Sequence, residues 1–151
     1  MDNKKYLETI LPHKDTMLLL DDIVDYNINE HWLKSCVTIK DSNLFYDKDL
    51  KGIDSVIGIE YMAQTIGCYA YLKQQLEKPE IGFLLGTRVY NNLTKVFVLG
   101  KTYCIFVKEV FVTEVFAFEC FIYNENNEEI ASATVNVYQD IDEKIKEILN
   151  G

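Results

Sequence analysis

Residues 54–76, DSVIGIEYMAQTIGCYAYLKQQL, form a long and mostly apolar stretch that constrains the fold of this chain most. Apolar residues recur at helical spacing from Ile57 to Leu72, and the run is too long for an ordinary strand. Asp54 or Ser55 can cap the first turn, and a proline follows the end. Because nearly every face of this predicted helix is apolar, we expect a sheet to wrap around it.

Glu60 interrupts the apolar surface one turn from the start of this helix, and Gln64 follows four residues later on the same face. A carboxylate in such a place must be hydrogen-bonded, neutralised or used in chemistry, because burial of an unpaired charge is costly. One interpretation is a partly exposed glutamate near the positive end of the helix dipole. The other is a general acid or base in a dry pocket. The pattern alone leaves both interpretations open.

Composition predicts one domain, residues 1–151, and excludes several classes of function. The chain has 151 residues, of which 48% are hydrophobic, enough for one sizeable core. Its net charge of −9 argues against nucleic-acid binding. No segment reaches the roughly 20 apolar residues of a membrane span. The opening MDNKKYLETILP mixes charged and apolar positions, unlike a signal peptide, so we expect a cytoplasmic protein.

The cysteines show neither CxxC spacing nor a nearby pair of histidines. They stand apart in apolar-rich stretches, and we expect all of them to be buried thiols in a reducing compartment. They are Cys36, Cys68, Cys104 and Cys120. No metal cluster, phosphate-binding glycine loop or Ser/His/Asp order is visible, so the sequence predicts no cofactor.

Segments rich in Val, Ile, Phe and Tyr on both sides of the helix are predicted to be strands. They cover residues 17–29, 31–40, 81–91, 101–124 with a reversal near 112–114, and 128–139. Asn124 to Asn127 supply the last hairpin turn. Residues 41–54 are predicted to be a loop anchored by Leu44 and Phe45, and short helices are expected at 6–10 and 141–150.

This order of elements predicts an α+β fold in which an antiparallel sheet of five or six strands wraps one long central helix. One helix does not seal such a sheet, and a free edge exposes unpaired backbone groups. We therefore expect a homodimer in which two sheets join edge to edge.

Four stretches resemble the small hotdog-fold β-hydroxyacyl-acyl-carrier-protein dehydratases. LPHKDTMLLLDDIVDY (11–26) is similar to their LPHRxPxLLVDRV signature, and GIEYMAQ (58–64) is similar to their VEAMAQ helix. IGFLLGTR (81–88) and LGKTYCIFV (99–107) stand where that family has its FLAGID and VxPGDxLxxxV strands. Within that family, the closest likeness of the first two stretches, LPHKDTMLLL and IEYMAQ, is to the divergent branch tied to aryl-polyene-type polyketide clusters.

The resemblance implies a hotdog fold and dehydration of a 3-hydroxyacyl thioester, carried by acyl carrier protein, to the trans-2-enoyl product. It implies that Glu60 is the catalytic carboxyl and Gln64 the glutamine of MAQ. Ser55 stands at the family's glycine turn, and the backbone N–H groups at Val56 and its neighbours would then face the thioester oxygen. The family's loop His is missing, and Tyr46 falls at its spacing from the glutamate. Tyr46 is a candidate proton donor, although a phenol is a poor base near neutrality and a packing or surface role is the main expectation for a tyrosine in a loop.

Other residues complete the candidate site. His13 is a second candidate for proton transfer, although a structural role at the entry to the first strand is the main expectation. Phe83 is expected to line an acyl tunnel, together with Leu84, Tyr61 and Ile57. Arg88, with Lys95 and Lys101, is expected to contact an acidic carrier protein. His31, in a polar turn, is expected to be solvated.

Three alternatives remain open from the sequence. A thioesterase of the same fold would use Glu60 to activate water. A non-catalytic subunit would form a heterodimer with a His-bearing hotdog relative, and the absent loop His favours that reading. An acyl-binding module would hold acyl chains without changing them.

Overall fold

The structure, a computed structural model, describes residues 18–77, 83–112 and 115–139, with side chains described for 18–73, 89–110 and 117–136. The short helices expected at 6–10 and 141–150 lie outside the described residues. Among the described helices, none is long and apolar enough to cross a membrane.

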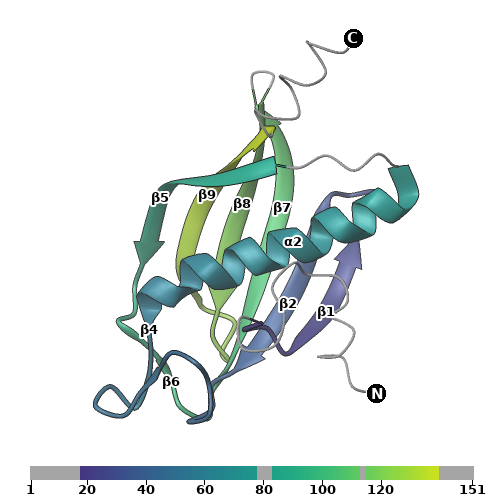
Figure 1. Ribbon diagram of the computed structural model, residues 1–151. Coiled ribbons are helices and arrows are strands. Elements are labelled where there is room, and N and C mark those ends of the chain that lie inside the picture. Colours follow the sequence, from purple (N-terminus) through teal and green to yellow (C-terminus); the bar gives the residue numbers. More distant parts are fainter. Residues whose placement is uncertain (1–17, 78–82, 113–114, 140–151) are drawn as a thin grey trace.

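A six-stranded antiparallel sheet forms one layer, and a long helix crosses one of its faces (Figure 1). The spatial order is β1-β2-β7-β8-β9-β5, so β1 and β5 are the edge strands. The bounds are Asp22–Asn27 for β1, Trp32–Thr38 for β2, Thr102–Val112 for β7, Val115–Tyr123 for β8, Glu129–Gln139 for β9 and Phe83–Asn92 for β5. This confirms the predicted α+β hotdog arrangement of one helix on an antiparallel sheet.

A second, three-stranded sheet of order β3-β4-β6 sits beside the start of the helix. It consists of β3 (Tyr46–Asp47), β4 (Gly52–Asp54) and β6 (Val96–Val98). The sequence predicts only a loop over 41–54, because strands of two or three residues are too short to show a period. The loop residues Leu44 and Phe45 are 50% and 40% exposed, so the expectation that they are buried anchors is wrong.

The long helix begins with a 3-10 turn, η2 (Ser55–Ile57), and continues as α2 (Gly58–Glu77). The Asp54 side chain accepts a hydrogen bond from the Val56 backbone N–H at 2.9 Å, which confirms Asp54 as the cap. Gly58 is required by close approach, since a Cβ atom there would collide with the Tyr90 hydroxyl. The helix is therefore pinned to β5 at its first residue.

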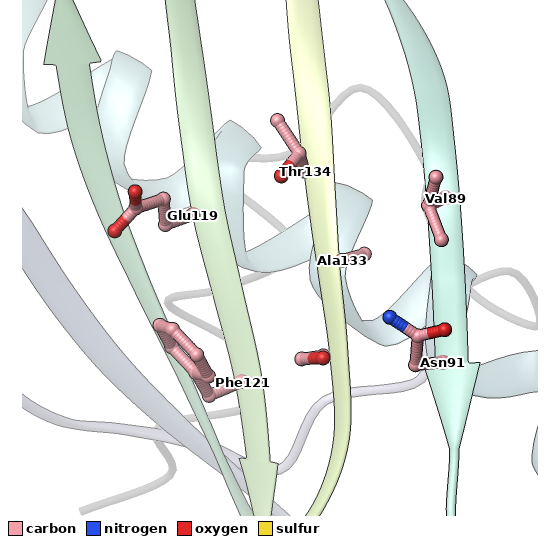
Figure 2. Close-up of a pocket in the computed structure, with 7 residues that line it drawn as sticks. Val89, Asn91, Glu119, Phe121, Ala133 and Thr134 are labelled. Carbon is pink, nitrogen blue, oxygen red and sulfur yellow. The ribbon is translucent and has the colours of Figure 1, made fainter.

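The face of the sheet turned away from α2 carries a shallow hollow of about 240 Å³ (Figure 2). Small side chains of β9 form its floor, and Glu119 and Phe121 from β8 stand opposite Val89 and Asn91 from β5. Aromatic rings continue along this face, with Trp32 and Phe106 centred 5.7 Å apart. We call this side the outer face.

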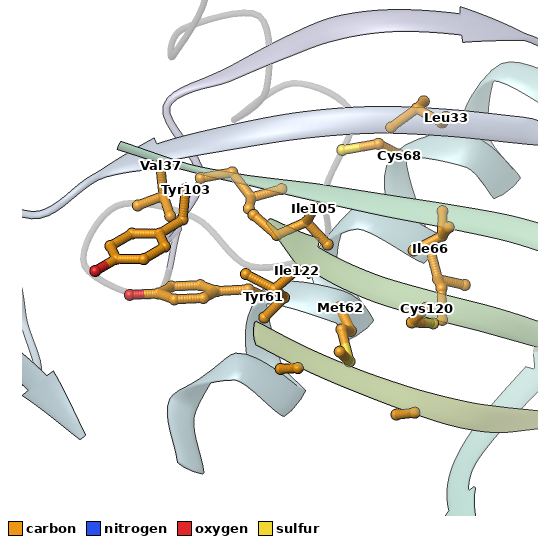
Figure 3. Packing of buried hydrophobic residues seen from close by; sticks show 14 of the residues in the cluster. Leu33, Val37, Tyr61, Met62, Ile66, Cys68, Tyr103, Ile105, Cys120 and Ile122 are labelled. Atoms are coloured by element: carbon orange, nitrogen blue, oxygen red, sulfur yellow. The ribbon is translucent and has the colours of Figure 1, made fainter. Parts of the chain in front are cut away.

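The core lies between α2 and the other face of the sheet (Figure 3). Tyr61, Met62 and Ile66 of the helix pack onto apolar side chains that alternate along the strands, such as Leu33, Val37, Ile105, Val107 and Ile122. A buried hydrogen bond of 2.7 Å joins the Ser35 and Thr65 hydroxyls within this layer. The helix is not enclosed on all sides, however. Residues Ile59, Glu60, Ala63, Gly67 and Ala70 are only partly buried, which corrects the expectation from its apolar surface.

Candidate functional site

The candidate site begins with Glu60 in the first turn of α2, the residue that both the sequence pattern and the resemblance single out. Its side chain is partly buried, and its Oε1 lies 3.4 Å from Gln64 Nε2, which donates to it. Gln64 is only 2% exposed, and its Oε1 accepts the Leu19 backbone N–H at 2.9 Å. The carboxylate is thus held by a buried amide that is itself fixed to the segment before β1.

The two roles of the Gln64 amide fix its orientation. The Leu19 N–H can only donate, so it requires the amide oxygen, and the amide nitrogen then points to Glu60. An ionised carboxylate is an acceptor only, which matches this donor. The arrangement orients the Glu60 carboxyl group so that one of its oxygens accepts a hydrogen bond from Gln64.

Ser55 connects the start of the helix to the strands beside it. Its carbonyl accepts the Tyr90 hydroxyl at 2.5 Å, its Oγ accepts Asn92 Nδ2 at 3.1 Å, and its N–H donates to the Lys95 carbonyl at 3.0 Å. The serine is 4% exposed. Burial raises the pKa of Tyr90 to about 12, with a smaller contribution from the Asp54 charge, so the phenol stays a hydrogen-bond donor at neutral pH. Ser55 therefore fixes the start of the helix to β5 and to the residue before β6.

Tyr90 and Asn92 are the residues that sequence reasoning missed. They stand in VYNN at the end of β5, where the two asparagines look like ordinary turn residues. The alternation of side chains along the strand predicts that Tyr90 points inward, but it does not show that the Tyr90 hydroxyl binds the Ser55 carbonyl. Their position shows that β5 sets the position of the helix start.

The Val56 amide has a partner in this structure, because it donates to Asp54. The Val56 side chain is 55% exposed. A thioester oxygen that binds at this amide, as the resemblance implies, has to compete with the Asp54 carboxylate. The role of Val56 stays a prediction.

Of the remaining predicted site residues, Tyr46 is the one whose side chain belongs to the described part of the chain. Tyr46 is a partly buried residue of β3, and no hydrogen bond joins it to Glu60 in the described part of the chain. Phe83 and Arg88 belong to β5, where Arg88 stands at a break in the register with β9, and their side chains are outside the described part. His13 also lies outside the described residues.

Of the residues expected to line an acyl tunnel, Tyr61 and Ile57 have described side chains. Tyr61 is 1% exposed and packs on Phe97 with ring centroids 5.4 Å apart, so it is a core residue here. Ile57 is partly buried against the same core. The hollow in Figure 2 lies on the outer face of the sheet, away from Glu60. It is therefore not an acyl pocket of the predicted kind.

Comparison with known proteins decides the family. A family model described as ApeP dehydratase, of the ApeP-like type, matches residues 5–150. The chain belongs to the ApeP-like family. The resemblance to hotdog dehydratases of the aryl-polyene branch is thereby confirmed. No curated protein matches this ApeP-like chain.

Solved structures similar to this ApeP-like chain share its fold at low sequence identity. The dehydratase heterocomplex ApeI:P from Xenorhabdus doucetiae gives a TM-score of 0.77 at 20% identity, over 96% of this chain and 97% of that chain. A hypothetical thioesterase from Streptococcus pneumoniae TIGR4 gives 0.61 at 12% identity, over 84% and 97%. The protein smu.793 from Streptococcus mutans UA159, bound to acetyl CoA, gives 0.55 at 18% identity, over 79% and 87%.

A polar cluster lies away from Glu60, further along α2 of this ApeP-like chain. Glu109 of β7 accepts Lys73 Nζ at 2.8 Å and the Tyr69 hydroxyl at 3.2 Å. His31 Nδ1 lies 3.4 Å from the same hydroxyl and 3.8 Å from the Glu109 carboxylate. The His31 side chain is 54% exposed, as expected, but its ring also lies against this cluster. The cluster ties the β1–β2 turn to the helix, and it does not touch the candidate site.

Proposed function

We propose that this chain acts in the dehydration of a 3-hydroxyacyl thioester, held on acyl carrier protein, to the trans-2-enoyl thioester. The setting we propose is fatty-acid or aryl-polyene-type polyketide synthesis in the cytoplasm. The observation that carries the proposal is the partly buried Glu60 carboxylate, oriented by the buried Gln64 amide at 3.4 Å. Membership of the ApeP-like dehydratase family supports it.

The chemistry requires one proton to leave the α-carbon and one to reach the departing 3-hydroxyl. In the proposed step, the Glu60 carboxylate removes the α-proton, and the electrons of the broken C–H bond are held by the α-carbon and the thioester carbonyl. Glu60 then delivers the same proton to the 3-hydroxyl as the C–O bond breaks, so that the group leaves as water and the α-carbon electrons form the new double bond. We propose that one carboxylate serves both ends, because no hydrogen bond joins Tyr46 to Glu60 among the described residues and Gln64 keeps the carboxylate in place.

The thioester carbonyl needs hydrogen-bond donors when charge develops on it. The start of α2 offers backbone N–H groups, and Asp54 already occupies the one at Val56. In the proposed complex the carbonyl lies at this turn and displaces the Asp54 carboxylate. The exposed position of Asp54 makes such a movement inexpensive.

We further propose that the working enzyme pairs this chain with a second hotdog subunit along β5. This edge strand has β9 on one side and no described strand on the other, and its residue Tyr90 touches the start of α2. A partner there would lie beside Glu60. The similar ApeI:P structure is a heterocomplex, and this chain has Tyr46 where the resemblance to other hotdog carrier-protein dehydratases implies a loop His. Both observations favour a related, His-bearing partner over a second copy.

A carrier protein is acidic, so its docking surface on this chain should be locally basic. Lys95 and Lys101 are exposed near the small sheet, although Lys101 Nζ lies 3.6 Å from Glu125. Arg88 belongs to β5, the strand that precedes these lysines in the sequence. We propose that these three residues contact the carrier protein.

A second candidate function is a non-catalytic subunit that supports a His-bearing partner. The occupied Val56 amide and the tyrosine at position 46 favour it. In that case the partner's own glutamate and histidine would carry all of the chemistry.

One experiment separates these functions. The purified chain, alone and mixed with a His-bearing hotdog dehydratase whose own catalytic glutamate has been replaced by glutamine, is incubated with a 3-hydroxyacyl carrier-protein thioester, and the mass of the acyl chain is measured by mass spectrometry. Dehydration removes one water and leaves the thioester intact, as proposed, whereas a thioesterase releases free thiol. No change in the acyl chain with or without the partner would contradict the proposal. Native mass spectrometry of the mixture reports the pairing.

A further inference from the structure

Two of the four cysteines face each other across neighbouring strands. Cys36 of β2 and Cys104 of β7 are direct partners in the antiparallel register, and the two strands lie side by side (Figure 1). Both are partly exposed, whereas Cys68 and Cys120 are buried. The expectation that all four thiols are buried is therefore wrong for this pair. Alternation along β2 and β7 places both side chains on the outer face, with Trp32 and Phe106.

The hydrogen-bond pattern between these strands fixes which kind of pair the cysteines form. The Glu109 N–H donates to the His31 carbonyl at 2.8 Å, and the Ile39 N–H donates to the Lys101 carbonyl at 3.0 Å. Hydrogen-bonded pairs alternate along an antiparallel ladder, so odd-numbered residues of β2 form them. Cys36 and Cys104 are therefore a non-hydrogen-bonded pair, the type in which facing side chains come closest.

The next pair of this type shows that the side chains meet. Thr38 Oγ1 and Thr102 Oγ1, two residues along the same face, are 2.8 Å apart. In such pairs the Cα atoms are about 4.5 Å apart, which falls inside the range of about 4.4–6.8 Å found for disulfides. No backbone rearrangement is needed to join Cys36 to Cys104.

We propose that Cys36 and Cys104 form a reversible cross-strand dithiol, oxidised to an intramolecular disulfide by small-molecule disulfides and able to chelate thiol-binding trivalent arsenic. With oxidised glutathione, one thiolate attacks a glutathione sulfur and releases one reduced glutathione. The second thiol then attacks the mixed disulfide at the protein sulfur and releases the other. Two protein thiols are oxidised and one glutathione disulfide is reduced, so the electrons balance.

The surroundings of the pair make this a slow and easily reversed reaction. Burial raises the pKa of Cys36 to about 11, and Cys104, Asp22 and Asp21 add to the rise. Tyr123 of β8 is the register partner of Cys104 on the other side. The Cys36 thiolate is therefore scarce at neutral pH, so the rate of its attack on a disulfide should rise with pH. A short Cα separation, near the limit for a disulfide, favours ready reduction.

The test uses the full chain in glutathione redox buffers at pH 8, followed by alkylation of free thiols and peptide mass mapping. We expect two of the four thiols to be protected, in one peptide pair that links residues 36 and 104. C36S and C104S should each abolish the internal disulfide, and Cys68→Ala should leave it unchanged. Phenylarsine oxide should bind one molecule per chain and lose this binding in either serine variant.

This arsenical readout does not depend on the oxidation rate. Four free thiols at equilibrium in fully oxidising buffer, a link to Cys68 or Cys120, or arsenical binding that survives both serine variants would each overturn the proposal. Far-ultraviolet circular dichroism of every variant confirms that it is folded.

Discussion

The contact between Gly58 and Tyr90 yields a double-mutant cycle with a defined sign. A Cβ atom on residue 58 would collide with the Tyr90 hydroxyl and would lie 3.0 Å from Ile122 Cδ1 and 3.2 Å from Phe97 Cζ. Overpacking of this kind costs about 1–3 kcal/mol. Alanine recovers up to about 1 kcal/mol as a better helix former. We expect Gly58→Ala to destabilise the protein by about 1–2 kcal/mol through these opposing effects.

Tyr90→Phe removes the hydroxyl that donates to the Ser55 carbonyl, which should cost about 1 kcal/mol. It also removes the atom that collides with an alanine at position 58. Adding Gly58→Ala to Tyr90→Phe should then cost only about 0–1 kcal/mol, because the two tighter aliphatic and aromatic contacts remain. The cycle therefore predicts a favourable coupling of about 1 kcal/mol between the two substitutions.

The assay is urea unfolding of the wild type, the two single variants and the double variant, followed by circular dichroism, with m-values compared to verify a common transition. If the two single effects add to within about 0.5 kcal/mol, the claim that the Tyr90 hydroxyl limits space at Gly58 is refuted. A coupling of the opposite sign would also refute it.

Other predictions concern the Gln64 amide and the buried thiol and phenol groups. Gln64→Leu should destabilise the fold by about 1–3 kcal/mol in urea unfolding, because the Leu19 N–H loses its acceptor; unchanged stability would show that this hydrogen bond is dispensable. Burial raises the pKa values of Cys68, Cys120 and Tyr90 to about 12, so their neutral forms stabilise the folded state. Stability from the thiols should be complete below about pH 9 and that from Tyr90 below about pH 10, and both should fall as pH rises towards about 12. Urea unfolding midpoints measured at pH 8 and pH 10.5 check this. The midpoint of Tyr90→Phe should fall less between the two pH values than that of the wild type. An equal fall in both proteins would contradict the contribution of the Tyr90 phenol.

The elements of the fold were largely predictable because each carries a local signal. Asp54 caps the helix as expected, and Asn127, with a φ of 60°, sits in the turn between β8 and β9 that the asparagines indicate. The long strands after the helix, β5, β7, β8 and β9, agree with the predicted segments within a few residues, whereas the three-residue strand β6 was not predicted. Alternating apolar residues and turn chemistry are properties of neighbouring residues in the chain, so they can be read without a structure.

The failures concern properties that depend on distant parts of the chain. Cys36 is partly exposed because its side chain lies on the outer face of the sheet. Its partner strand, β7, is far away in the sequence, so the pairing of Cys36 with Cys104 cannot be read from neighbouring residues. His31 is drawn into a cluster by Tyr69 and Glu109 from two other elements. The role of Tyr90 depends on where β5 passes the helix start. None of these three properties leaves a pattern among neighbouring residues of the sequence.

The central claim is that the Glu60 carboxylate moves the protons in the dehydration, and a matched pair of variants tests it most directly. Glu60→Gln keeps the size and hydrogen bonding of the side chain but removes the base, and Glu119→Gln makes the same change on the outer face. The rate of conversion of a 3-hydroxyacyl carrier-protein thioester to the enoyl product is measured for both, with the hotdog partner present. The account predicts a loss of at least about 100-fold for Glu60→Gln and none for Glu119→Gln. An unchanged rate in a folded Glu60→Gln protein would contradict it.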